Sequence, residues 1–355
     1  MKTRAPNWTG VLAALMSALL FGAGTPFAKK LLPGTNPVLM AGLLYLGSGI
    51  GLAIYWLLAR ATTNSTAREA KLRRHDVPWL VAAFFAGGVA GPILLLVGLA
   101  KTPATNASLL LNFEGVFTAL LAWFVFRENF DFRIMLGMAL ITAGGMILGW
   151  AGRPTLVMPW GSLAIAGACL AWAIDNNLTR KISGGDPVQI AMLKGLLAGA
   201  FNTCLGLLAG GALPATNKLA AIALIGLISY GISLTLFVLA LRHIGAARTG
   251  AYFSTAPFVG AIISIFLLRE QVTPVLGIAG ALMAVGVWLH LTERHEHPHR
   301  HEPMEHEHLH YHDEHHQHPH SPADPPGEPH SHWHRHEALV HSHPHYPDLH
   351  HRHRH

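Results

Sequence analysis

Three ionisable residues lie well inside apolar stretches of the sequence: Glu114, Asp175 and Lys194. If such stretches cross a bilayer, a charge inside one costs about 2.5 to 3.5 kcal/mol on insertion scales, so it persists where it faces a cavity or a partner. Asn112 and Asn176 stand beside or close to the carboxylates and add amide donors and acceptors. We predict that these five residues form a site for a substrate or a coupling proton. No nucleophile–base pair or phosphate-binding loop accompanies them, so an enzyme is not expected.

A purely structural role is the alternative for each ionisable residue. Glu114 could be a protonated carboxyl group that is hydrogen-bonded to a neighbouring helix, which costs far less than a buried charge. Asp175 lies about 7 Å of helical rise from the end of its apolar stretch, where a cap or a salt bridge is also expected. Lys194 could pair with either carboxylate for stability, or it could bind an anionic group of a substrate.

A second set of residues that could bind a ligand consists of the histidines near the C-terminus. Residues 293–355 hold 23 of the 26 histidines, mixed with nine prolines and 11 acidic residues. Residues i and i+2 of an extended chain lie on one side about 7 Å apart, so a flexible segment can bring several imidazoles onto one ion. Neutral imidazole suits Zn, Ni, Co and Cu. The predicted metal ligands stand at alternate positions: His295, His297, His299, His301, His306, His308, His310 and His312.

This tail contains almost nothing that could form a core, so we expect it to be disordered without a ligand. Its metal affinity makes divalent ions expected partners, with Zn, Ni or Co bound by the tail. No cofactor is expected to be required.

The remainder of the chain has the composition of a membrane protein. Hydrophobic residues make up 51% of the sequence and charged residues 12%, against about a quarter charged in soluble domains. A bilayer helix needs about 20 apolar residues. Ten such segments occur, at residues 8–28, 37–59, 78–100, 103–126, 132–150, 158–179, 187–210, 218–241, 246–268 and 274–292. The expected fold class is therefore all-α and integral to the membrane, with the lipid bilayer as partner.

The positions of the cations predict the orientation and argue against a nucleic-acid partner. With the N-terminus inside, 13 lysines and arginines fall in the inner tail and loops, against six in the outer loops. The positive-inside rule then places both termini in the cytoplasm. A nucleic-acid binder would gather its cations with aromatic residues on a soluble face, whereas here they separate apolar stretches.

The sequence contains an internal duplication. The segment from Lys101 to Glu128 is similar in sequence to the segment from His243 to Glu270. Both segments end on an Arg-Glu pair, and the two pairs lie 142 positions apart. Residues 35–38 correspond to residues 185–188 at an offset of 150. Five helices in each copy would place the second copy upside down relative to the first, which is a common plan of secondary transporters.

This pattern resembles the drug/metabolite transporter superfamily and, within it, the EamA-type exporters. The resemblance covers about residues 8–292 and rests on the duplication, the small-residue entries at 103–104 and 245–247, the closing Arg-Glu pairs and Ala256-Pro257. It implies a bacterial inner-membrane carrier with a central substrate cavity. One departure is that Glu114-Gly115 stands in the first copy where the second has Ala256-Pro257.

We therefore expect EamA-like five-helix repeats at residues 1–150 and 151–292, followed by the tail at 293–355. The favoured function is secondary export of small organic metabolites, with the tail sensing or buffering metal. The alternative is a Zn, Ni or Co transporter whose tail collects ions, and a transport-inactive metal store is a third possibility. A metal path needs several converging ligands, and the apolar segments offer only Glu114, Asp175, Cys169 and Cys204. Both cysteines are expected to be buried free thiols.

Overall fold

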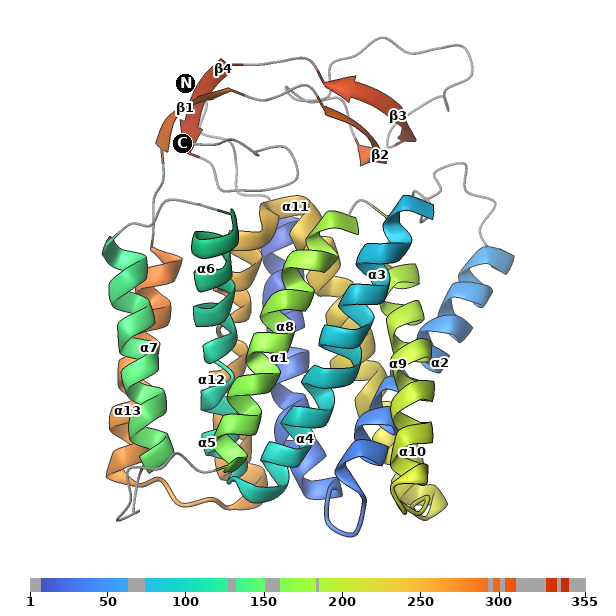
Figure 1. Cartoon of the computed structure of the whole chain (residues 1–355), viewed down its shortest axis with the longest axis vertical. Helices are drawn as coiled ribbons and strands as arrows, with labels where there is room; N and C mark the ends of the chain where they lie inside the picture. Colours follow the sequence, from blue (N-terminus) through green and yellow to red (C-terminus); the bar gives the residue numbers. More distant parts are fainter. Residues whose placement is uncertain are drawn as a thin grey trace.

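The computed structural model describes residues 8–62, 74–126, 132–150, 160–182 and 185–292, together with 296–300, 304–310, 330–336 and 340–344 of the tail. Figure 1 shows a bundle of nearly parallel and antiparallel helices in which α1 begins and α13 ends at the same end. The tail strands lie beyond that end. The end at which α1 begins is called the terminal end below, and the other is called the far end.

The first half of the bundle holds five spans, of which the third and fourth are composite. It consists of α1 (Trp8–Leu31), α2 (Pro37–Thr62), η1 (Arg74–Asp76) with α3 (Val77–Ala83), η2 (Phe84–Ala90) and α4 (Gly91–Lys101), then α5 (Ala104–Leu110) with α6 (Phe113–Phe126), and α7 (Phe132–Trp150). The second half holds α8 (Trp160–Ile182), α9 (Pro187–Leu208), α10 (Thr216–Ile225) with η3 (Gly226–Ile232), α11 (Ser233–Phe253), α12 (Ala256–Leu268) and α13 (Pro274–Leu291).

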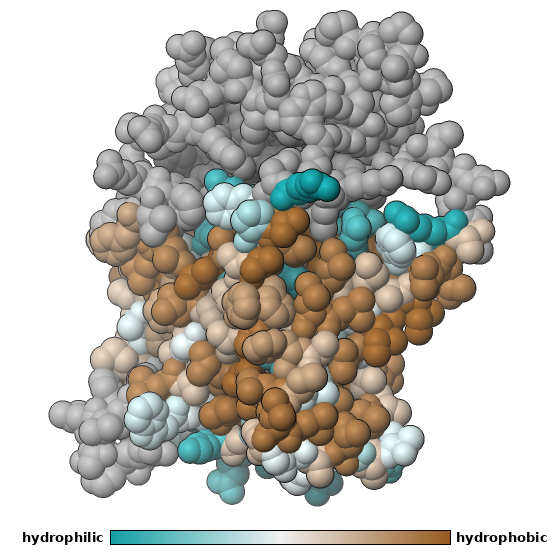
Figure 2. All heavy atoms as spheres, turned by 45° about the vertical axis from the view of Figure 1, so that its right-hand side comes forward, coloured by the Kyte–Doolittle hydropathy of each residue, from teal (hydrophilic) through white to brown (hydrophobic). Residues whose placement is uncertain are grey.

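The ten predicted spans are confirmed within the described residues. Six helices are long and apolar enough to cross a membrane, and parts of α7 and α13 form shorter apolar helices. The remaining spans are the interrupted pair α5–α6 and the helix α8, which carries Asp175. Large apolar side chains are exposed along the outside of the bundle, and Figure 2 shows them as a broad hydrophobic belt. A bilayer is the solvent that such a surface requires.

Helix starts in the two halves repeat the same chemistry. Asn36 accepts hydrogen bonds from the backbone N–H groups of Val38 and Leu39 at 2.9 and 3.3 Å, and a proline opens α2. Asp186 does the same for the second and third residues of α9, at 2.9 and 3.3 Å, again with proline first. Side-chain caps of this kind satisfy the free N–H groups of a first turn. The register of 150 that the sequence suggested is therefore a repeated helix cap.

The packing of the helices also follows the duplication. The second helix of one half, α2, packs along the second helix of the other, α9, and the two fifth helices, α7 and α13, pack together likewise. Helix α1 packs on α11 and α12, as α8 packs on α4 and α6. Since each half has an odd number of spans, equivalent helices run in opposite directions, which gives two inverted five-helix repeats.

Glycines bring α2 and α9 into backbone contact. A Cβ atom at Gly49 would collide with the backbone of Gly195 and Leu196, and one at Gly199 would collide with Leu46. Lipid is as apolar as leucine, so helices in a membrane associate by close packing rather than by hydrophobic burial. The small-residue spacing therefore marks the seam between the two halves.

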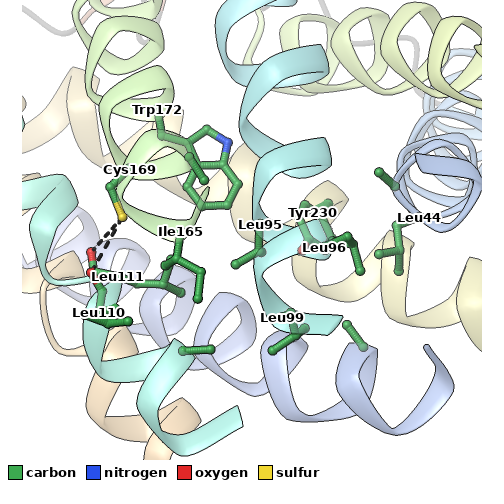
Figure 3. Packing of buried hydrophobic residues seen from close by; sticks show 14 of the residues in the cluster. Leu44, Leu95, Leu96, Leu99, Leu110, Leu111, Ile165, Cys169, Trp172 and Tyr230 are labelled. Atoms are coloured by element: carbon green, nitrogen blue, oxygen red, sulfur yellow. Dashed lines mark hydrogen bonds between the residues drawn. The ribbon is translucent and has the colours of Figure 1, made fainter. Parts of the chain in front are cut away.

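A compact apolar core joins the third, fourth and sixth spans. Helix α8 contributes Ile165 and Trp172, which face Leu95 and Leu96 of α4, and Tyr230 of η3 lies close by (Figure 3). All five side chains are buried.

Each half contains one π-helical segment, and the two segments lie 142 positions apart. These are η2, with the sequence FFAGGVA, and η3, with the sequence GLISYGI. A π-helical turn widens the helix and leaves backbone carbonyls without their usual partner, and it is frequent at functional sites. The offset equals that of the two Arg-Glu copies, so the repeat extends further toward the N-terminus than its letters reveal.

The structure differs from the sequence expectations at three places. Helix α11 continues through the expected loop at 242–245 and ends at Phe253. Cys169 is buried as expected, but Cys204 is exposed on the outside of α9, and both are free. In the tail, β1 (Glu296–Arg300) pairs with β4 (Val340–Pro344) and β2 (Met304–His310) with β3 (His330–His336), where disorder was expected. The alternating sequence of these segments suits the two-residue period of a strand.

Candidate functional site

The fourth and ninth spans are both broken near their middle. Helix α5 stops at Leu110 and α6 starts at Phe113, with turn residues between them, and α11 stops at Phe253 before α12 starts at Ala256. At the first break, Asn112 and Glu114 donate backbone hydrogen bonds to carbonyls three residues back, at 3.1 and 3.0 Å. Broken helices that expose backbone groups between inverted halves mark the binding sites of many transporters.

Glu114 stands in the first turn of α6, directly after this break. The positive end of a helix dipole favours a carboxylate there. Its Oε1 accepts a hydrogen bond of 2.6 Å from Nδ2 of Asn176 on α8. Glu114 is half-buried, and no described cation forms a salt bridge with it. Glu114 and Asn176, which were both predicted as site residues, are therefore brought together across two helices.

Asn112 lies inside the break and has unused hydrogen-bonding capacity. Its Nδ2 donates to the carbonyl of Leu109 at 3.0 Å, while its Oδ1 is buried and has no partner among the described residues. Cys169 of α8 lies beside the same break, with its Sγ 3.7 and 3.8 Å from the carbonyls of Leu110 and Leu111 (Figure 3). The break thus holds polar groups that a ligand or water could satisfy.

Asp175 and Lys194 form a buried ion pair between α8 and α9. The Lys194 Nζ donates to both carboxylate oxygens, at 2.7 and 2.6 Å, and the two side chains are 8% and 1% exposed. Thr179 donates a further hydrogen bond of 3.0 Å to the same carboxylate. The structure therefore pairs Lys194 with Asp175 and not with Glu114.

Helix α8 presents the two acidic sites to different neighbours. Asp175 and Asn176 are adjacent, so their side chains leave the helix about 100° apart, given 3.6 residues per turn. Asp175 meets Lys194 of α9, and Asn176 meets Glu114 of α6. One turn of α8 thus connects an ion pair with an acid that lacks a described counter-ion.

The π-helical segment η2 borders the ion pair. The carbonyl of Gly87 accepts hydrogen bonds from the Tyr45 hydroxyl at 2.9 Å and from the Trp172 indole at 3.1 Å. The next carbonyl, of Gly88, accepts from Asn202 at 2.8 Å. A Cβ atom at Gly87 would collide with the Asp175 carboxylate, so glycine allows this close approach. Three side chains from three helices thus satisfy the carbonyls that the π turn frees.

Aromatic rings line the centre of the bundle next to these groups. The ring of Phe21 on α1 lies 5.6 Å from Trp172, 5.8 Å from Tyr230 and 5.3 Å from Phe253 between centroids. Tyr45 lies 5.3 Å from Tyr230. The edge-to-face and tilted arrangements are those that aromatic pairs prefer. The rings come from α1, α2, α8, η3 and α11 and therefore join both halves.

At the far end of the bundle, Glu270 connects the halves. Its carboxylate follows α12 and accepts hydrogen bonds from the backbone N–H groups of Ala104 and Thr105 at 2.7 and 2.8 Å, and from the Thr105 hydroxyl at 2.5 Å. Lys29 donates to the carbonyls of Leu99 and Thr102 nearby. Glu270 therefore caps the first turn of α5 in the opposite half. Arg127 and Glu128 lie outside the described residues.

The predicted metal ligands lie in the tail. His295, His301 and His312 are outside the described residues, and the other five belong to β1 and β2. Among the described side chains of the bundle, no group of three or more His, Cys, Asp or Glu residues is placed to hold a metal ion.

Two inverted halves, broken helices and buried charges near the centre define a class of protein, the multi-pass membrane transporters. The comparison with known families agrees with this class. The chain belongs to the EamA-like transporter family, which it matches over residues 8–150 and 159–292.

Relatives with curated descriptions are transporters as well. The chain is 28% identical over 292 residues to an uncharacterized transporter of Methanothermobacter thermautotrophicus, covering 79% of this chain and 85% of the relative. It is 24% identical over 252 residues to the uncharacterized transporter YyaM of Bacillus subtilis, covering 67% and 82%. A solved structure described as "Crystal structure of protein" superimposes with a TM-score of 0.60 at 19% identity, over 79% of this chain and 96% of that one, and shows the shared fold.

Proposed function

We propose that this protein is a secondary-active exporter of small organic metabolites whose substrate or coupling proton binds at Glu114, Asn112 and Asn176. The observation that carries the proposal is the half-buried Glu114 carboxylate, which stands at a helix break between two inverted halves and is held by Asn176 at 2.6 Å. A group at such a position is poised to exchange a partner on one side for a partner on the other. The proposed location is the bacterial inner membrane, with both termini in the cytoplasm.

In this scheme Asp175 and Lys194 hold α8 and α9 together beside the site. Their pair is satisfied by Thr179 and enclosed by the apolar core, which makes it a framework for the Glu114 site and a second recognition point for charged substrates. Aromatic faces at Phe21, Trp172 and Tyr230 offer an apolar or cation-binding wall. Polar groups with an aromatic wall suit a small organic solute that carries at least one hydrogen-bonding or charged group.

The second candidate function is transport of Zn, Ni or Co, which the 23 histidines of the tail favour. In that case the tail would collect ions for a path through the bundle. The bundle offers the carboxylates Glu114 and Asp175, of which Asp175 is already bound by Lys194. A paired carboxylate is a poor metal ligand, because the metal must displace the lysine. The organic-solute function is therefore our proposal, with a metal-binding tail as an appendage.

Transport into inverted membrane vesicles separates the two functions. Vesicles with and without the protein would receive a panel of labelled amino acids and related metabolites, and a second panel of Zn, Ni and Co, under an imposed proton gradient. We expect protein-dependent accumulation of at least one organic solute and of no metal. Accumulation of metal alone would contradict the proposal and establish the alternative.

A further inference from the structure

The two ladders of the tail place histidines directly opposite histidines. In β2 and β3 the opposite pairs include His306 with His334, His308 with His332, and His310 with His330. In β1 and β4 they include His297 with His343 and His299 with His341. Sequence reasoning considered neighbours within one strand only, so it left out the histidines of β3 and β4.

The two ladders share one pairing offset. The residue numbers of every opposite pair add up to 640 in the β1–β4 ladder and in the β2–β3 ladder alike. Strands β1 and β2 therefore pair antiparallel with β4 and β3 at one common offset. This offset places the alternating histidines of β1 and β2 opposite the alternating histidines of β4 and β3.

Alternation assigns these histidines to one face of each ladder. Residues of even number in β2 and β3 share a face, which carries Met304 and the seven histidines His306, His308, His310, His330, His332, His334 and His336. The opposite face carries Glu305 across from Arg335, an opposite-charge pair that favours this register. A slip by one residue would place histidines across from other residue types, so the imidazole pairing depends on the register.

The spacing of such pairs suits a transition metal. Directly opposite residues have Cβ atoms about 4.5 to 5.5 Å apart, and the next pair lies about 7 Å along the strands. Zinc binds imidazole nitrogen at about 2.0 to 2.1 Å, usually with four ligands in a tetrahedron. One opposite pair supplies two ligands, and an adjacent pair supplies two more.

We propose that the tail is a metal-organised hairpin in which cross-strand histidine pairs bind first-row divalent transition ions, with zinc as the reference ion. This inference rests on the proposed metal-binding role of the tail and adds its geometry. A two-stranded ladder is marginal in water, and residues 311–329 between β2 and β3 add the entropy of loop closure. Metal binding to opposite strands supplies the missing free energy, so binding and pairing occur together.

Spin labels on the face without histidines test the proposal in the full-length protein. Cysteines would replace Leu309 and Ser331, which are directly opposite and belong to that face. Cys169 would be changed to Ala and Cys204 to Ser, so that the labels are the only thiol adducts. The matched control pairs Leu309→Cys with Ser342→Cys, because Ser342 is opposite Pro298 in the other ladder and lies 11 positions from Ser331 along the chain.

Zinc should produce strong dipolar broadening in the 309/331 pair and none in the 309/342 pair. Substituting His308→Ala and His332→Ala together should raise the zinc concentration needed for broadening by about tenfold, since two ligands are lost. Acidification to pH 5 should reverse the broadening, because protonation near pH 6.5 removes the imidazole lone pairs. Equal broadening in both pairs would show collapse without register and would overturn the proposal.

Zinc stoichiometry separates failure of the geometry from failure of the metal role. Equilibrium dialysis would compare the full chain with a chain that ends at residue 294. If the tail binds zinc but the 309/331 pair stays unbroadened, the hairpin is wrong and the metal-binding role survives. If both chains bind the same amount of zinc, the tail does not bind metal and both proposals fall.

Discussion

At the residue scale, the arrangement around α8 distinguishes two acids by their partners. Asp175 is held by Lys194 and Thr179, so its negative charge is already compensated. Glu114 has an amide partner in Asn176 and the start of α6. The residue with fewer fixed partners is the one that can exchange them during a transport cycle, which is why the proposed site centres on Glu114.

The Asp175–Lys194 pair should behave as a unit in stability measurements. Removing one partner leaves an uncompensated charge in a buried place, at a cost of about 3 to 5 kcal/mol. We expect Asp175→Asn and Lys194→Met each to lower the midpoint temperature of thermal unfolding in detergent. The double variant should have a higher midpoint temperature than either single variant. Additive losses in the double variant would show that the two charges do not stabilise each other.

Asn112, Glu114 and Asn176 could be singled out from sequence because they interrupt apolar stretches. Their contacts could not be predicted, because no pattern in one sequence states which helices become neighbours. The pairing of Lys194 was left open between two carboxylates for the same reason. Tyr45 and Asn202, which bond the carbonyls of Gly87 and Gly88, were missed because neither stands beside a charged residue in the sequence.

At the element scale, the ten spans and their duplication followed from hydrophobicity and repeated letters. The break at 111–112 did not, because it lacks the proline that stands at Pro257 in the second half. The π segments were also invisible, since their sequences share no identical pattern. The role of Glu270 could not be predicted, because its partner, the first turn of α5, lies in the other half.

Two glycines provide a matched test of the seam between α2 and α9. Gly49→Ala should destabilise the protein, because the added Cβ atom meets the backbone of Gly195 and Leu196. Gly277→Ala should be neutral or stabilising by up to about 1 kcal/mol, because nothing lies within 4 Å of an added Cβ and alanine favours a helix. Both variants would be compared by thermal unfolding. Equal midpoint temperatures would show that the contact between α2 and α9 accommodates the extra Cβ atom.

At the scale of the whole molecule, the helical bundle and the histidine-rich tail differ in composition, and they meet at the end of α13. The bundle is held by close packing between inverted halves within a hydrophobic belt (Figure 2). The tail has 11 acidic and 23 histidine residues, and its described strands are paired through their backbones. The family match ends at residue 292, so the tail lies outside it.

The most direct test of this account is flux through proteoliposomes made from three proteins: the full chain, a chain that ends at residue 294, and Glu114→Gln. The organic solute identified in vesicles would be followed under a proton gradient at low and high zinc. We expect the first two proteins to transport the solute at similar rates, with only the full chain responding to zinc, and Glu114→Gln to fold normally but lose most of its flux. Near-normal flux in Glu114→Gln, or solute flux that disappears with the tail, would contradict the account.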